Sequence, residues 1–437
     1  MNIFKNILII LAFWSTNLSL SWANTFSELK ENSKYENKTY FYKFNDPTSD
    51  STHDSRRTHA LTTLETSSGA ELGDQSYFNI DLLVYLHSMD DNHDDTLHLF
   101  ERNNQYAAIL APKILNILYE SDDFDFTFGL DLVDFGYAEL HNSVSNFGRA
   151  NSLHPTHSYD LGVILGRYQK YFDDDTLSYT MMPVEIASLV PIKSNRWRGT
   201  GDVYGTLPNG SSVSNIEIKP LAVNTNNIRH LVNYEAVRSG YDYYLFGALG
   251  PSPFSVIRIK DSVYEKYNPW SWQVGGGINT VYGPYKIYSD MMYQFTAHQN
   301  DENFIRGTIG GVFKNSTWIK NFGINEIILT TEYARDENTR NQSKRSDLIF
   351  SSRNSRTGIN TILSRVDFDV DDTWKVISVV HYNLEDSDNT KILGLRYKVN
   401  DSLGFFAAGT WFDGTDRTLL GIQRDNDTIE FGIKKNF

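Results

Sequence analysis

The sequence predicts an all-β protein, a transmembrane antiparallel β-barrel of about 16–18 strands. Three observations predict this fold class. The chain ends in a strand with one apolar and one polar face, similar alternating segments recur through most of its 437 residues, and its N-terminus has the features of an export signal. A barrel that crosses a membrane needs such strands, because alternate residues of each strand face lipid.

The last ten residues carry the clearest pattern. One parity is apolar, with Ile429, Phe431 and Ile433, and the chain stops on Phe437; the other parity is polar or glycine from residue 428 to residue 436. The closing strand of a transmembrane barrel presents an apolar face to lipid and an aromatic residue at the membrane interface. In Gram-negative bacteria, a terminal Phe on such a strand resembles the signal for outer-membrane insertion.

Residues 1–23 have the pattern of a secretory signal peptide. Lys5 lies in a short positive start, residues 7–20 are mostly apolar, and Ser21-Trp22-Ala23 is a small-x-small cleavage site. We expect this segment to be removed, leaving a short polar segment at 24–38 and the barrel at 39–437. A membrane-anchoring helix is the alternative, but it needs roughly 20 apolar residues, and this run is shorter and interrupted.

Dyad alternation recurs between these ends, in segments of about 8–13 residues separated by Asp, Asn, Gly and Ser. In residues 124–132 every even position is apolar and every odd position is polar or glycine. Residues 76–85, 374–383, 391–399 and 403–411 repeat the pattern less strictly. A soluble sandwich or propeller is the alternative fold, but its outer faces would be polar rather than rich in aromatic residues.

Composition excludes several classes of protein. The chain has no Cys, which removes disulfides, thiolate metal sites and Cys nucleophiles. Its 26 Tyr, 26 Phe and 8 Trp suit the aromatic girdles of a barrel, and its net charge of −14 argues against a nucleic-acid partner. No Gly-x-Ser-x-Gly or His-Glu-x-x-His motif occurs, so we expect no enzyme activity and no cofactor.

The polar parity of the strands is expected to line a water-filled lumen, because side chains cannot fill so wide a barrel. The candidate pore-lining residues carry both signs of charge: Glu217, Lys219, Arg229, Glu235, Arg365, Asp367, Lys375, Arg396 and Lys398. For any one of them, simple solvation of the wall or cross-strand pairing is the plainer interpretation. As a set they predict a passage with electrostatic selectivity.

Several segments resemble the OprD-type family of substrate-specific outer-membrane porins, which includes chitoporin-like members. The segments are TLETSSGAELG (63–73) with the strand after it, residues 160–176 followed by LSYTMMPV (177–184), and YDYYLFGAL (241–249) followed by DSVYEKY (261–267). NRWRGT (195–200) lies where the family has an Asp-Ser-Arg-Leu-Leu-Pro-like stretch; only one Arg matches, and the acid and the Leu pair are missing. Alginate-export-like barrels share much of this pattern and stay open as an alternative.

The resemblance implies an 18-stranded barrel, as a monomer or a homotrimer, narrowed by an inward-folded third loop and lined by basic residues that guide an anionic solute. Mapped onto this chain, it places the constriction in residues 181–206, with Lys193, Arg196 and Arg198 as candidates. The alternative, that Arg196 and Arg198 are solvent-facing or contact lipopolysaccharide, stays open.

The predicted function is therefore an outer-membrane porin for small hydrophilic solutes, with carboxylate-bearing or oligosaccharide solutes as candidate cargo. Lipopolysaccharide, outer-membrane lipid and the barrel-assembly machinery are its expected partners. A polysaccharide-export barrel and a structural or adhesive barrel are the alternatives. The Asp- and His-rich segment 87–98 could bind a cation. An outer loop is the simpler interpretation of this segment, and we expect no metal site.

Overall fold

The computed structural model describes residues 28–45, 56–88, 98–99, 108–183, 188–189, 191, 195–198, 227–260, 263–297, 301–340, 348–415 and 417–437. The expected signal peptide lies outside these residues, so its removal stays a prediction. Within the described ranges, no helix is both long and apolar enough to cross a membrane.

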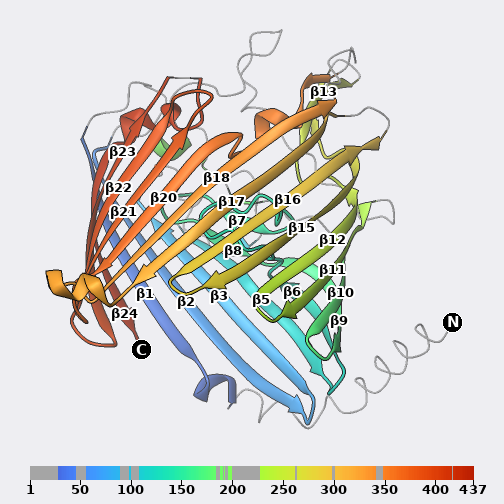
Figure 1. The fold of residues 1–437 in the computed structure, drawn as a ribbon, viewed down its shortest axis with the longest axis horizontal. Coiled ribbons are helices and arrows are strands. Elements are labelled where there is room, and N and C mark those ends of the chain that lie inside the picture. Colours follow the sequence, from blue (N-terminus) through green and yellow to red (C-terminus); the bar gives the residue numbers. More distant parts are fainter. Residues whose placement is uncertain are drawn as a thin grey trace.

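Eighteen antiparallel strands close into one barrel, which confirms the predicted fold class and strand number (Figure 1). Each strand pairs with the next barrel strand along the chain, and the last strand pairs with the first. The barrel strands are β1 (Lys34–Phe44), β2 (Thr58–Gly73), β3 (Ser76–His87), β5 (Ala108–Glu120), β6 (Phe124–Asp131), β9 (Val163–Phe172), β10 (Asp175–Met182), β11 (Arg229–Arg238), β12 (Tyr241–Pro251), β15 (Trp270–Tyr282), β16 (Tyr285–Thr296), β17 (Asn303–Asn315), β18 (Glu326–Arg340), β20 (Asn360–Asp369), β21 (Trp374–Asn383), β22 (Asn389–Lys398), β23 (Leu403–Asp413) and β24 (Thr428–Asn436).

Shorter elements lie in the connections. They are β4 (His98–Leu99), β7 (Arg149–Asn151), β8 (Tyr159–Leu161), β13 (Val256–Lys260), β14 (Val263–Tyr267), β19 (Leu348–Phe350) and the 3-10 helices η1 (Arg196–Arg198), η5 (Trp318–Phe322), η6 (Ser352–Ser355) and η7 (Gly421–Asn426). Strand β1 begins at Lys34, inside the segment that was expected to be a polar lead-in to a barrel starting at residue 39.

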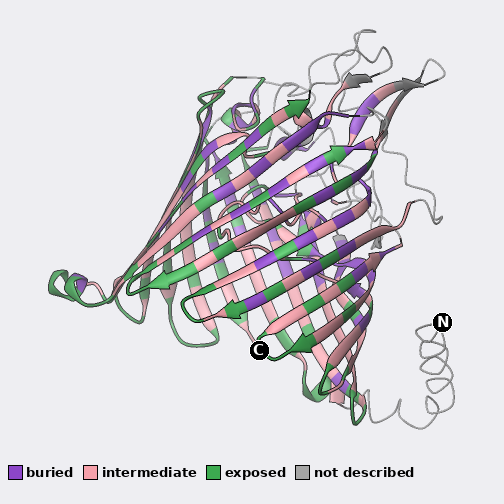
Figure 2. Ribbon diagram, turned by 45° about the vertical axis from the view of Figure 1, so that its right-hand side comes forward, coloured by how far each residue is buried: buried purple, intermediate pink, exposed green. Residues whose placement is uncertain are grey.

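The two faces of the barrel wall differ in burial along each strand, which Figure 2 shows as alternating colours. In β24, Ile429, Phe431 and Ile433 are 44%, 58% and 40% exposed, whereas Thr428 and Glu430 are buried. This is the parity that the sequence predicts for the closing strand. The outer face is therefore apolar and accessible, as lipid contact requires, and the polar residues point inward.

The connections at the two ends of the barrel differ in length. At one end β9 and β10 are joined by residues 173–174 and β15 and β16 by residues 283–284. At the other end the connections include residues 132–162 and 183–228. Short turns on one side and long loops on the other are typical of outer-membrane barrels.

Candidate functional site: the lumen and its inward loops

The third long connection, residues 132–162, lies inside the barrel, where Figure 1 shows β7 and β8 surrounded by the wall. Its apolar side chains pack with residues of β9, β10, β12 and β17 in one buried cluster. The cluster includes Val133, Val144 and Phe147 from the loop and Tyr244 and Phe246 from the wall. These contacts hold the loop against the inner surface of the barrel rather than above its mouth.

Two carboxylates of the wall bind consecutive backbone N–H groups of this loop. Asp290 accepts hydrogen bonds from the backbone N–H of Tyr137 at 2.9 Å and of Ala138 at 2.7 Å. Glu332 accepts from the N–H groups of residues 139, 140 and 141 at 2.6, 2.9 and 2.7 Å. Backbone N–H groups of five consecutive residues are thus bonded to β16 and β18, which fixes this segment on the wall.

Each of these carboxylates belongs to a repeated row of tyrosine, glycine and acid on adjacent strands. Tyr244, Gly277 and Asp290 form one row across β12, β15 and β16, and the Tyr244 hydroxyl donates to Asp290 at 2.7 Å. In the second row, Tyr288 and Glu332 flank Gly310 on β17, and the Tyr288 hydroxyl donates to Glu332 at 2.5 Å. Glycine is required between them: a Cβ on Gly310 would lie 2.7 Å from both the Glu332 side chain and the Tyr288 ring.

The far end of the loop reaches the opposite wall. His157 Nε2 lies 3.1 Å from a Glu430 carboxylate oxygen of β24, and its ring packs on Tyr40 of β1 at a centroid distance of 4.0 Å. The His154 ring packs between Tyr42 and Trp197 at 4.5 and 4.4 Å. Because residues 137–141 are bound at β16 and β18, the loop crosses the lumen.

Two histidines of the loop, the half-buried His141 and the buried His154, are held uncharged. Burial, and secondarily the nearby Arg306 guanidinium, lower the pKa of His141 to about 3. The guanidinium of Arg306 can only donate, and it lies 3.2 Å from His141 Nε2, so this nitrogen accepts and carries no proton. Burial lowers the pKa of His154 well below its usual value. The loop is thus built for the neutral form of both rings.

The described residues of the fourth long connection contact the third connection and the segment between β23 and β24. The Leu189 N–H donates to the Ala150 carbonyl at 2.9 Å, and the Leu189 carbonyl accepts from the Ser152 N–H at 2.8 Å, which links the two connections. Arg196 is almost fully buried: its Nε donates to the Asn426 side chain at 2.7 Å, and its guanidinium lies 4.0 Å above the Phe44 ring. The side chain of Arg196 therefore attaches this connection to the segment between β23 and β24.

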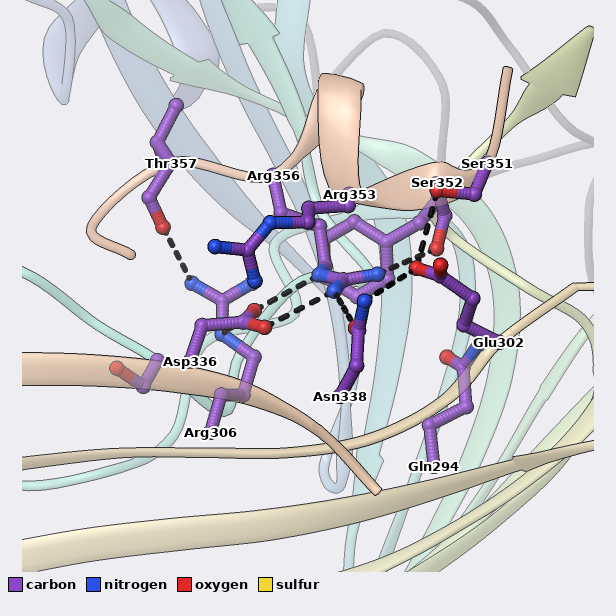
Figure 3. A network of polar contacts seen from close by, with 12 residues as sticks. Gln294, Glu302, Arg306, Asp336, Asn338, Ser351, Ser352, Arg353, Arg356 and Thr357 are labelled. Atoms are coloured by element: carbon purple, nitrogen blue, oxygen red, sulfur yellow. Dashed lines mark hydrogen bonds and ion pairs between the residues drawn. The ribbon is translucent and has the colours of Figure 1, made fainter. Parts of the chain in front are cut away.

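A third inward segment comes from the connection between β18 and β20 (Figure 3). Arg356 donates to both carboxylate oxygens of Asp336 at 2.8 and 2.9 Å and stacks on the Phe304 ring at 3.8 Å. Arg306 approaches the same carboxylate at 3.9 Å and also donates to the backbone carbonyl of Thr357. This pairing lets buried arginines fix the segment on the inner faces of β17 and β18, since a buried charge needs a hydrogen-bonded partner.

A cavity of about 1210 Å³ remains beside β20–β24 and β1, towards the end with the short turns. Its lining includes a polar wall and the aromatic rings of Tyr40 and Phe406. Most of its charges are paired: Lys375 lies 3.0 Å from Asp369, and Arg365 donates to Asp367 at 2.9 Å. Arg396 also lines it and makes no ion pair within the described residues.

Comparison with known proteins identifies the fold. No family model matches the sequence, and no curated protein does. Among solved structures, OccAB3 of Acinetobacter baumannii is 9% identical with a TM-score of 0.51, over 93% of this chain and 98% of its own. OccAB1 of the same organism is 7% identical with a TM-score of 0.51, over 93% of this chain and 95% of its own. These neighbours are porins of the OprD/Occ family.

The fold is that of an outer-membrane porin. At such identities the likeness shows the fold alone, so the chemistry of this porin-like lumen has to be argued from its own residues.

The sequence-predicted residues occupy different parts of this porin-like barrel. Arg365, Lys375, Arg396 and Lys398 line the cavity. Asp367 lies beside them, bonded to Arg365. Arg229 is bonded to the carbonyl oxygens of Pro251 and Ser252, and Glu235 accepts from Asn233 at 2.6 Å. Lys193, Glu217 and Lys219 lie outside the described residues, as does the side chain of Arg198.

Sequence reasoning placed the inward loop in residues 181–206, which comprise the end of β10 and part of the fourth long connection of the barrel. It missed residues 132–162, the third connection, which crosses the lumen. A signal was present: this stretch of 31 residues contains several aromatic and apolar positions without dyad alternation. The acidic anchors Asp290 and Glu332 were also missed, because a lone acid on a polar parity is indistinguishable from a wall charge.

Proposed function

We propose that the chain is an outer-membrane diffusion channel for small hydrophilic solutes. One observation carries this proposal: a closed barrel with an apolar outer face encloses a polar lumen that a loop crosses and narrows. An apolar outer face suits lipid, and a polar lumen suits hydrated solutes. Lipopolysaccharide, the assembly machinery, and a monomeric or trimeric state belong to the same proposal.

We further infer that the cavity wall favours anionic solutes, among which carboxylate-bearing ones fit best. Arg396 supports this, because it presents an unpaired guanidinium to the cavity between Lys375 on β21 and the Phe406 ring on β23. A guanidinium binds a carboxylate through two parallel hydrogen bonds. Charges within the narrow passage outweigh the distant net charge of −14, since salt screens exposed charges beyond roughly 8–10 Å.

A constriction role for Lys193, Arg196 and Arg198 stays part of this proposal as well. The Arg196 guanidinium is already bonded to Asn426, so we expect it to act mainly by holding the fourth connection in place. Lys193 and Arg198 are the members of the group whose side chains could act on a solute directly.

The test is single-channel recording in planar bilayers under a salt gradient. We expect discrete conductance steps and a reversal potential of anionic sign, which Arg396→Ala shifts towards cation preference. Arg335→Ala is the matched control, because Arg335 lies on the outward parity of β18 and pairs with Glu337. A protein that inserts but never conducts would instead support a structural or adhesive barrel. An unchanged reversal potential in Arg396→Ala would contradict the proposed preference for anionic solutes, but not the proposal that the barrel is a channel.

A further inference from the structure

One connection at the short-turn end of the barrel differs from its neighbours. Residues 316–325 join β17 to β18 and carry the helix η5, whereas residues 283–284 suffice to join β15 to β16. Figures 1 and 2 show η5 projecting outward from the rim rather than lying across the lumen. A plain turn would close the hairpin equally well, so the additional residues need another explanation.

The projecting segment is held in a defined conformation. The Asn315 side-chain oxygen accepts from the backbone N–H groups of Thr317 and Trp318 at 3.1 and 3.2 Å. Gly323 closes the helix with a φ of 75° and donates its N–H to the Lys320 carbonyl at 3.0 Å. Ile319 is buried and so fastens the helix to the barrel. These contacts fix the direction of the remaining side chains.

Two of those side chains are large, aromatic and accessible. Trp318 is 48% exposed and Phe322 is 72% exposed, and their rings meet edge to face at a centroid distance of 6.1 Å. Lys320 of the same helix lines the rim of the cavity described above, so the aromatic pair alone forms the outward surface of η5. Exposed Trp and aromatic side chains of this kind are typical of membrane interfaces, because their rings leave water at the level of the lipid headgroups.

The pair continues an aromatic band on the outward face of the barrel. Tyr285 and Phe313, on β16 and β17, lie at a centroid distance of 5.2 Å, and Trp374 and Tyr397, on β21 and β22, at 4.5 Å. All four belong to the outward parity near the short-turn end, and η5 lies between the two pairs along the wall. Rows of aromatic residues at this level form the interfacial girdle of a membrane barrel.

We propose that η5 is a membrane anchor that lies in the headgroup region of the lipid leaflet at the short-turn end. Trp318 and Phe322 insert at the boundary of headgroups and acyl chains. The anchor widens the contact of β17 and β18 with the membrane beyond the wall itself. It rests on the proposed function only in requiring that the barrel spans a membrane.

The absence of cysteine allows a direct test. The full chain is refolded into phosphatidylcholine–phosphatidylglycerol vesicles with a single cysteine, labelled with an environment-sensitive dye, at position 322 (Phe322→Cys). Two controls carry the same dye: Trp374→Cys in the outward aromatic band, and Ser402→Cys in the turn between β22 and β23. Nitroxide lipids labelled near the headgroup or near the chain end report the depth of each dye, and aqueous iodide reports its exposure to water.

We expect the dye at position 322 to behave like the dye at 374, with stronger quenching by the headgroup-side nitroxide and at least threefold weaker iodide quenching than at 402. If the dye at 322 shows the same nitroxide and iodide quenching as the dye at 402, the anchor proposal is overturned, and contact with a protein partner becomes the explanation for this surface. A dye at 374 that also reports water would overturn the membrane barrel itself. If labelling disturbs folding, brominated lipids should quench the tryptophan fluorescence of the unlabelled parent more than that of Trp318→Phe; equal quenching also overturns the anchor.

Discussion

At the scale of single residues, Glu332 shows how one side chain can position a segment. Its carboxylate accepts three consecutive backbone N–H groups of the third connection and the hydroxyl of Tyr288. Four donors satisfy this buried carboxylate without a cation beside it. Glycine at position 310 is what brings the tyrosine and the acid together across the intervening strand.

We predict that Tyr288→Phe destabilises the barrel by about 1–2 kcal/mol, because it removes one hydrogen bond to a buried carboxylate. Urea unfolding in detergent micelles or vesicles measures the change. Tyr282→Phe is the control, since Tyr282 is 85% exposed at the end of β15 and should tolerate the loss of its hydroxyl. Equal effects of the two substitutions would show that the Tyr288 hydroxyl adds nothing to the row.

At the scale of elements, the third connection is bound at one wall through its backbone and at the other through its rings. The backbone bonds to Asp290 and Glu332 do not depend on the identity of the loop side chains. The contacts of His141 and His154 do, and both rings are bound in the neutral form. The loop is therefore held in two ways: by backbone hydrogen bonds that do not depend on its side chains, and by histidine contacts that depend on pH.

We predict that acid weakens the docking of this loop. The pKa of His141 is about 3 in the docked loop and 6.5 ordinarily, so between these values only the undocked loop takes up the proton. Docking is strongest above pH 6.5 and weakens as the pH falls, by about 2–3 kcal/mol at pH 4.5. The expected result is a larger or noisier single-channel conductance at pH 4.5 than at pH 7.5.

His141→Asn should reduce that pH response, because the amide can accept from Arg306 but does not titrate in this range. Global unfolding is a poorer measurement: burial raises the pKa of Asp301 to about 6, and its contribution to stability falls as the pH rises. A conductance independent of pH in the parent would show that the loop stays docked with His141 charged.

At the scale of the whole molecule, the two faces of the wall follow different rules. The outward parity has to be apolar, and a charge near the bilayer midplane costs about 2–4 kcal/mol. The inward parity tolerates charge where water fills the lumen. Two neighbouring residues of one strand therefore differ sharply in their tolerance of a charged side chain, although they lie at the same depth in the membrane.

We predict that Leu395→Arg impairs membrane insertion by about 2–4 kcal/mol, whereas Arg396→Leu leaves assembly intact. Leu395 is 40% exposed on the outer face, and Arg396 lines the cavity. The yield of heat-modifiable, folded protein in vesicles compares the two variants. Similar yields would mean that the strand is not embedded in this register.

The sequence predicts the strands and their orientation well because both are local properties. The alternation in residues 374–383 and 391–399 corresponds to β21 and β22, with Leu393 and Leu395 outward as expected. The inward loop is another matter, since its position depends on carboxylates far away along the chain. Glu139 and Glu332 are 193 residues apart, and no local pattern links them.

That separation bears on the order of assembly. The N–H groups of residues 139–141 cannot find Glu332 until β18 has formed, and His157 cannot reach Glu430 until the last strand closes on the first. Contacts between such distant residues form late, because the chain between them has to be ordered first. An inserting chain would therefore pass through a stage in which the barrel is nearly complete while its passage is still wide. A protein arrested at that stage should leak solutes that the finished barrel excludes.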